Sequence, residues 1–349
     1  MEEIYVGIDL HRKFSFAAVM NKSGKIKENQ RLEHDNLQKF ISFFRKYDKA
    51  KITMEATCGW MWVADLLEDM GHEVTLAHSS GVKAISSSHK KTDKIDAKTL
   101  GNLLRTNYLP EAYLAPKEVR SNREILRLRT SLVKTRTMAK NRVQSQLIKI
   151  NKRPLVTDIF GRKGREALEN YELPEVHRKV VDEWLLLIDF VDMRIAEIEK
   201  EIKSRLEKDP RADILQSMPG IGMLTAYTII SEVGDIERFA NADKFSSYCG
   251  LVPSTHQSAD KVYHGRLVMG RTTLKWNIVE ATHIAKMRDS YFATVFQKYL
   301  KKNNRTRATI ICAHKMAKII YRMLKEMRPY RPKSKNGEMK VGSSAPVTN

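Results

Sequence analysis

Residues 4–20 read IYVGIDLHRKFSFAAVM, two apolar runs separated by a short polar turn. The runs at 4–10 and 13–20 carry the β-branched and aromatic residues that are typical of neighbouring strands. A turn, NKSGK (21–25), and the run IKENQRL (26–32) then predict a third strand. We therefore expect an antiparallel three-stranded meander at the start of the chain.

Helices and strands alternate after this meander. The patterns predict helices at 36–47 and 60–71, strands at 51–56 and 72–78, and another helix at 93–107. Three antiparallel strands followed by alternating helix and strand are the element order of an RNase H-like α/β fold. In that fold the first and fourth strands lie side by side at the centre of the sheet.

Four carboxylates occupy positions that this fold would bring together. Asp9 lies in the first strand and Glu55 near the end of the fourth, where a buried charge is costly without a partner. Asp93 and Asp96 lie three apart in KKTDKIDAKTL (90–100), so a helix beginning there places both on one face. The alternative is an ordinary helix start, because Asp is a good N-cap and the first turn favours negative charge. Together the four predict a site for Mg²⁺, with Mn²⁺ as an alternative, because both prefer oxygen ligands.

The 349-residue chain is strongly basic. It has 62 Lys and Arg against 41 Asp and Glu, a net charge of +21 and a sequence pI near 9.8, which favours a polyanionic partner. Nucleic acid is the expected partner rather than a membrane, because no apolar run approaches spanning length. The basic residues gather in 117–149, with 10 against 2 acidic, and in 261–349, with 20 against 4. Further lysines, which would draw phosphates to the acidic pair, are Lys90, Lys91, Lys94 and Lys98.

Two features of the sequence concern its cellular compartment. The N-terminus, MEEIYVGIDL, has no charged-then-apolar signal, so we expect the protein to stay in the cytosol. Cys58, Cys249 and Cys312 show no CxxC or Cys/His spacing, which argues against a disulfide framework and a zinc site.

The pattern changes to long helices after Pro116. Apolar positions at helical spacing over 117–150 and 175–208 predict two arms of a helical hairpin or coiled coil. Asp209-Pro210 breaks the second helix, and a mainly helical region follows to about residue 328. The predicted division is a catalytic domain at 1–110, a helical arm at 111–209, a C-terminal domain at 210–330 and a disordered basic tail at 331–349.

Two stretches of the C-terminal domain could contact nucleic acid. In MPGIG (218–222), Gly220 and Gly222 are typical of a helix-hairpin-helix, where glycines let the backbone approach phosphates; the alternative is a plain turn between packed helices. The second stretch, YCGLVPSTHQSADKVYHGRLVMGRTTLKW (248–276), offers Ser254 and Ser258 as nucleophiles. The same stretch contains three cations that could stabilise a phosphoryl transition state: Lys261, Arg266 and Arg271. Chemistry alone does not choose between the serines, and a phosphate-binding loop remains an alternative.

The chain resembles the DEDD transposases of the one-ten family of insertion sequences, which include the Piv-type DNA invertases. The resemblance extends over nearly the whole length and rests on GIDLHRK, MEAT, KTDKIDAKTL, MPGIG and YCGLVPSTHQSADKVYHGRLVMGRTTLK. It implies a RuvC-like N-terminal domain, a coiled-coil middle and a C-terminal transposase domain whose family serine matches Ser258. Ala259 and Asp260 stand where the family usually has glycines, and Gln257 stands where many members have a second serine.

The resemblance implies a recombinase that cuts and rejoins DNA strands. Ser258 would form a covalent link to a DNA 5′-phosphate, activated by the acidic tetrad with Mg²⁺, and a structured RNA encoded by the element would pair with donor and target DNA. The protein would work as a homo-oligomer, a dimer or tetramer, in the prokaryotic cytoplasm at the nucleoid, with a site completed within one subunit or between two. One alternative is a RuvC-like metal-dependent nuclease that hydrolyses junctions with water. The other is a non-catalytic nucleic-acid-binding protein.

Overall fold

The computed structural model describes residues 2–57, 59–85, 92–152, 156–258, 261–268 and 270–332, without the side chains of 255–258 and 261–264. These residues form two compact units, Met1–Ala115 and Pro116–Asn349. The finer division of the second unit at residue 210 stays a prediction. Most of the predicted tail, from residue 333 onward, lies outside the described residues.

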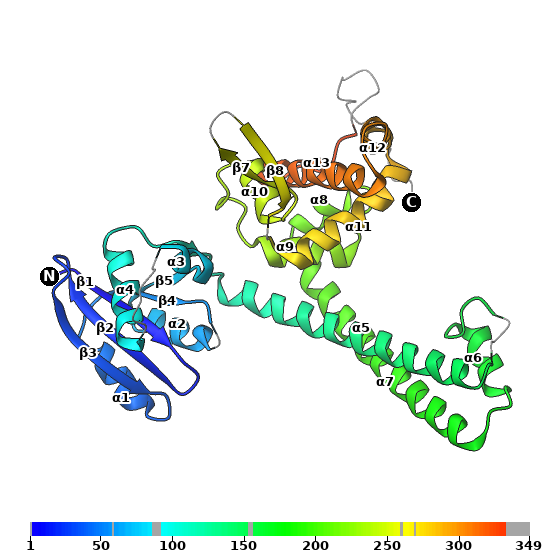
Figure 1. Ribbon diagram of the computed structural model, residues 1–349, viewed down its shortest axis with the longest axis horizontal. Coiled ribbons are helices and arrows are strands. Elements are labelled where there is room, and N and C mark those ends of the chain that lie inside the picture. The colour runs from blue at the N-terminus through cyan, green and yellow to red at the C-terminus, as the bar shows by residue number, and fades with distance from the viewer. Residues whose placement is uncertain are drawn as a thin grey trace. The chain divides into compact units, whose positions relative to one another are not determined.

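The first unit is built on a six-stranded sheet of order β3-β2-β1-β4-β5-β6 (Figure 1). Its strands are β1 (Ile4–Leu10), β2 (Phe14–Asn21), β3 (Ile26–Glu33), β4 (Lys51–Glu55), β5 (Glu73–Ala77) and β6 (Glu111–Ala112). β1 pairs antiparallel with β2 and parallel with β4. The expected meander and the adjacency of the first and fourth strands are therefore present. The short strand β6 was not predicted.

In the described part of this unit, four helices accompany the sheet: α1 (Leu37–Phe44), α2 (Trp60–Asp69), α3 (Ser79–Ile85) and α4 (Asp93–Arg105). Alternate residues of β1, such as Val6 and Ile8, are fully buried in one core with Phe40 of α1 and Leu67 of α2. The intervening residues of β1 point to the opposite face, because side chains alternate along a strand. That opposite face is the one covered by α4.

Close contact between β1 and α4 depends on Gly7. A Cβ atom at this position would overlap the Ala97 carbonyl oxygen and the Gly101 backbone nitrogen of α4. The absence of a side chain thus allows the helix backbone to lie directly against the strand. As a result, the N-terminal turn of α4 is held close to the end of β1, where Asp9 lies.

The second unit begins with an arm of two long helices, α5 (Lys117–Lys149) and α7 (Glu175–Leu206), joined through α6 (Arg162–Glu169) (Figure 1). Arg129 bonds Glu199 at 2.6 Å and Arg136 bonds Asp192 at 2.6 Å, so the two helices run antiparallel. Their apolar faces meet in a buried cluster that includes Val143. Supercoiling of this pair stays a prediction.

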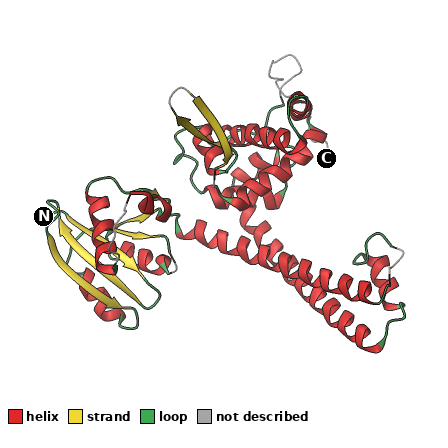
Figure 2. Cartoon of the chain, viewed as in Figure 1, coloured by secondary structure: helices red, strands yellow, loops and turns green. Residues whose placement is uncertain are grey.

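The remainder of the second unit is a helical body with one β-hairpin (Figure 2). Its elements are α8 (Arg211–Gln216), α9 (Met223–Val233), α10 (Ala242–Tyr248), β7 (Pro253–Ser258), β8 (Lys261–Leu267), α11 (Thr272–Arg288), α12 (Ser290–Leu300) and α13 (Arg305–Glu326). The core contains Tyr227, Phe245 and Phe292, each almost wholly buried. The hairpin was not predicted, because its polar residues do not alternate with apolar ones.

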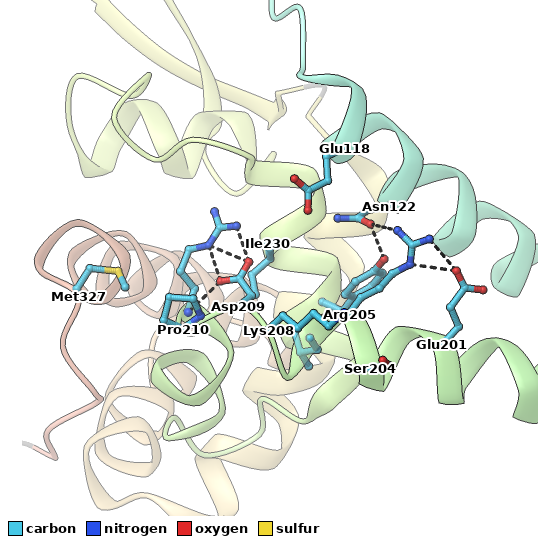
Figure 3. Close-up of a pocket in the computed structure, with 13 residues that line it drawn as sticks. Glu118, Asn122, Glu201, Ser204, Arg205, Lys208, Asp209, Pro210, Ile230 and Met327 are labelled. Atoms are coloured by element: carbon cyan, nitrogen blue, oxygen red, sulfur yellow. Dashed lines mark hydrogen bonds and ion pairs between the residues drawn. The ribbon is translucent and has the colours of Figure 1, made fainter.

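A polar joint ties the arm to this body around a cleft of about 780 Å³ (Figure 3). Asn122 of α5 accepts hydrogen bonds from the Tyr227 hydroxyl of α9 and from Arg205 of α7, both at 3.0 Å. Arg211 bonds Asp209 and donates to the Gly234 carbonyl at 2.7 Å. Because these groups satisfy one another, we interpret the cleft as a structural joint.

Candidate active site

Asp9 and Glu55 lie at the carboxyl ends of two neighbouring parallel strands. Ile8 of β1 is paired with Met54 of β4, so Asp9 and Glu55 are the next residues along each strand. Gly7 faces α4, and residues two apart in a strand share a face, so Asp9 is on the α4 side. The parallel register places Glu55 on the same side. An arrangement with the two carboxylates on opposite faces is thus ruled out by the register.

Asp93 and Asp96 occupy the first turn of α4. The N-cap is Thr92, whose side chain accepts a hydrogen bond from the Ile95 amide at 3.3 Å. The alternative that an aspartate caps this helix is therefore wrong, although negative charge in the first turn still suits the helix dipole. Lys94 is exposed and Lys98 is partly buried on the same helix, whereas residues 90 and 91 lie outside the described residues.

His11 joins the acidic residues in a way that the sequence analysis missed. Its Nε2 atom lies 3.1 Å from Asp9 Oδ2 and 3.3 Å from Asp93 Oδ1. Ligand atoms of these three residues all lie within 4.8 Å of one another. The available signal was the spacing of two between Asp9 and His11, at the point where β1 enters the turn to β2.

The surroundings of Asp9 in this cluster shift the pKa of its carboxyl group. Burial raises the pKa of the Asp9 carboxyl, and Asp93 and Asp96 raise it further, while His11 opposes the rise. Mutual repulsion of partly desolvated carboxylates is relieved when a cation binds between them. The donor set therefore fits a divalent metal. Within the described residues, the compact group contains Asp9, His11 and Asp93; Asp96 lies near it, and Glu55 is placed by strand register.

Ser258 is the last residue of β7, and its backbone is paired with Lys261 of β8. The side chains of both residues, and the whole of Ala259 and Asp260, lie outside the described part of the chain. Ser254, the other candidate, is partly buried in the same strand. The choice of Ser258 thus rests on the family motif.

The two glycines of MPGIG have different structural roles. Gly220 has a φ of +92°, and a Cβ there would overlap the Ala281 backbone of α11. Packing between helices therefore accounts for Gly220. Gly222 is the N-cap of α9, and a Cβ there would have nothing within 4 Å. Of the pair, Gly222 is the position that leaves the backbone open to a ligand.

Basic residues line a cleft of about 420 Å³ between α5 and the start of α11, which we name the α5–α11 cleft. Its lining residues are Arg123, Leu126, Arg127, Thr130, Ser131, Lys134, Glu232, Gly270, Arg271, Thr272 and Thr273. Arg271 donates to the Tyr248 hydroxyl at 3.1 Å and lies 3.8 Å from Glu232. Arg266, on β8, is exposed. The two predicted arginines therefore differ, since only Arg266 is largely surrounded by solvent.

Comparison with known proteins assigns both units. Residues 6–152 match a family of DEDD transposases, described as "Transposase", and residues 212–297 match the "Transposase IS116/IS110/IS902 family". The chain belongs to the insertion-sequence transposases of the IS110 type. This confirms the resemblance drawn from the motifs, the RNase H-like fold of the first unit and the assignment as a DNA transposase.

Several relatives cover most of this transposase. A probable family 20 transposase of Pseudomonas aeruginosa is 26% identical over 310 residues, covering 83% of this chain and 88% of the relative. The transposase of insertion sequence element IS1328 from Yersinia enterocolitica is 24% identical, covering 82% and 85%. The pilin gene-inverting protein of Moraxella bovis is 26% identical, covering 74% of each chain. None of the helices described for this transposase is long and apolar enough to cross a membrane.

Proposed function

We propose that this transposase cuts and rejoins the DNA of its insertion sequence with the acidic residues of the first unit and Ser258 of the second. The observation that carries the proposal is the convergence of Asp9 and Asp93, from a central strand and a helix start, in a chain of the DEDD family. Glu55, by its register beside Asp9, and Asp96, by its effect on the pKa of Asp9, complete the proposed tetrad.

These four carboxylates would hold Mg²⁺ or Mn²⁺. A bound divalent ion supplies charge stabilisation at the phosphate and lowers the pKa of a coordinated oxygen. The protein itself contributes rigid placement: Gly7 lets α4 contact β1, and Thr92 fixes the first turn of that helix. Lys94, exposed on α4, supports the approach of a phosphate to this acidic surface.

The proposed chemical step is a transesterification at a DNA phosphate. The Ser258 hydroxyl loses its proton as its oxygen bonds to phosphorus. The bond from phosphorus to the 3′ oxygen breaks, and the 3′ oxygen takes up a proton, leaving the 5′ phosphate on serine. Attack by a 3′ hydroxyl of another strand reverses these changes and rejoins DNA without net hydrolysis.

DNA binding follows from membership of the transposase family, and the proposed contacts are the cations of the second unit. The α5–α11 cleft combines Arg127 and Lys134 of α5 with Arg271 at the N-terminus of α11, a suitable surface for phosphates. Arg266, Lys261 and the open backbone at Gly222 are further proposed contacts. The family resemblance implies a structured guide RNA as a further proposed partner, and the two separate basic segments are compatible with it.

The proposed homo-oligomer is supported by an apolar row on α7. Leu186, Phe190 and Met193 are 64%, 57% and 50% exposed and lie at helical spacing on one face. Such a row on a soluble arm is suited to a second copy of the chain. The carboxylates and Ser258 belong to different units, so a second copy could also complete the site.

Trapping the covalent intermediate tests the proposed function. Full-length protein would be incubated with DNA carrying its element's end, Mg²⁺ and RNA transcribed from the element's flanks, then denatured and resolved by mass. Wild type and Ser254→Ala should form a protein–DNA adduct, and Ser258→Ala should form none. An adduct with Ser258→Ala would show that the nucleophile is wrong. Nicking without any adduct would favour the alternative of hydrolysis by water.

A further inference from the structure

The position of His11 in the acidic cluster has a geometric explanation beyond hydrogen bonding. Ligands in adjacent positions of an octahedral ion, each at about 2.1 Å, lie about 3 Å from each other. His11 Nε2 is 3.1 Å from one oxygen of Asp9 and 3.3 Å from one oxygen of Asp93. These two separations match those between neighbouring ligands of one ion, and a hydrogen bond also allows them.

The imidazole ring is held in this position by the turn that follows β1. The His11 amide donates to the Phe14 carbonyl at 3.0 Å, closing the turn. The ring stacks on Phe14, with centroids 4.6 Å apart, and the Arg31 guanidinium lies 3.7 Å from the centroid of Phe14. A ring restrained by both backbone and stacking loses little freedom on binding a ligand, which favours a role as a metal ligand.

We propose that His11 is a metal ligand, through Nε2, in the same site as Asp9 and Asp93. This inference rests on the proposed function, because it assigns a nitrogen donor to a site otherwise made of carboxylates. Imidazole nitrogen suits transition metals, whereas Mg²⁺ strongly prefers oxygen. The mixed donor set therefore makes the site bind Mn²⁺ more tightly than Mg²⁺, and His11 is the residue responsible for that difference.

Mn²⁺ provides a probe that does not depend on catalysis. Full-length protein would be titrated with Mn²⁺ and free ion measured by electron paramagnetic resonance; pulsed measurements on the bound ion would then detect ¹⁴N coupling. Wild type should show coupling to one histidine nitrogen. His11→Gln should lose the coupling and bind Mn²⁺ at least about tenfold more weakly, while Mg²⁺ affinity, measured by competition, changes much less.

His34→Gln is the matched control. His34 contacts the same turn, through the Arg12 carbonyl at 3.3 Å, and bonds the Ser15 hydroxyl at 2.7 Å, but is not part of the three-residue group. This variant should keep both the nitrogen coupling and the Mn²⁺ affinity. A coupling lost in His34→Gln and kept in His11→Gln would overturn the assignment.

The outcomes separate this inference from the proposed function. Bound Mn²⁺ without nitrogen coupling in the wild type would overturn His11 as a ligand and leave the carboxylate site standing, without requiring any variant to fold. Equal losses of Mn²⁺ and Mg²⁺ affinity in His11→Gln would overturn its role in metal preference. Wild type that binds no Mn²⁺ would overturn both this inference and the proposed metal site.

Discussion

The acidic cluster around Asp9 and the hairpin that carries Ser258 are packed very differently. Asp9 lies near the end of β1, in which Val6 and Ile8 are fully buried, and α4 packs against this strand at Gly7. Ser258 ends a two-stranded sheet in which β7 and β8 pair with each other. We infer that the proposed metal-binding carboxylates are held in place by the packed strand and helix, whereas the proposed nucleophile, Ser258, lies at the end of a two-stranded hairpin.

The largest expected effect concerns the acidic cluster. Asp93→Asn should lower strand cleavage by about a thousandfold or more, because the proposed metal site would supply several kcal/mol of transition-state stabilisation. DNA affinity, measured by gel shift, should be nearly unchanged. Asp48→Asn, an exposed aspartate of the same unit, is the control and should cleave normally. Equal cleavage by Asp93→Asn and wild type would show that the acidic cluster takes no part in strand cleavage.

The packing of the helical body of the second unit can be tested at Gly220 and Gly222. Gly220→Ala should lower the free energy of unfolding by about 3 kcal/mol, because the new Cβ meets the Ala281 backbone at a φ of +92°. Gly222→Ala should cost less than about 1 kcal/mol, since its Cβ enters open space. Denaturant unfolding would measure both, and similar costs would contradict the distinction between the glycines.

We expect DNA to bind the second unit mainly at the hairpin and the α5–α11 cleft, and less at the tail. Replacing Arg266 and Arg271 with Gln should weaken DNA binding by about tenfold and reduce its salt dependence, because phosphate contacts release counterions. Replacing Lys333 and Lys335 of the tail should weaken it less. Thermal unfolding should accompany the assay, since Arg271 also contacts Tyr248. Equal losses of DNA affinity from the two pairs of substitutions would contradict binding centred on the hairpin and the α5–α11 cleft.

The smallest expected effect lies at the joint between arm and body. Burial raises the pKa of Asp209, but hydrogen bonds from Arg211 and its charge outweigh burial and hold the pKa below the ordinary 3.8. A folded pKa below the unfolded one means that this pair stabilises at neutral pH and loses its effect as pH falls below about 4. Asp209→Asn should therefore cost about 1 kcal/mol at pH 7 and progressively less below pH 4.

Unfolding of wild type and Asp209→Asn across pH 3 to 7 would check this expectation. Asp213→Asn, at an exposed position of α8, is the matched control. A cost of Asp209→Asn that does not change with pH would show that the carboxylate charge is irrelevant to the joint.

The order of the strands, with the first beside the fourth, could be predicted because it follows from local patterns and the succession of elements. Alternation of apolar and polar residues sets which side of a strand is buried, and the succession of strands and helices then restricts the topology. The predicted strand at 26–32 and helix at 93–107 agree with β3 and α4 to within two residues at each end. The motif around Ser258 likewise identified the family from sequence, although its side-chain geometry stays a prediction.

Only the tertiary structure showed that His11 meets Asp93, because contact between residues 82 positions apart depends on how closely α4 packs on β1. Packing also separated Gly220 from Gly222, which the motif treats alike. The hairpin β7–β8 was hidden for a related reason: its sequence shows no regular alternation of apolar and polar residues, so backbone pairing rather than hydrophobic patterning defines it. Local periodicity thus determined the elements, whereas the contacts that set the chemistry of each side chain arose from packing between distant segments.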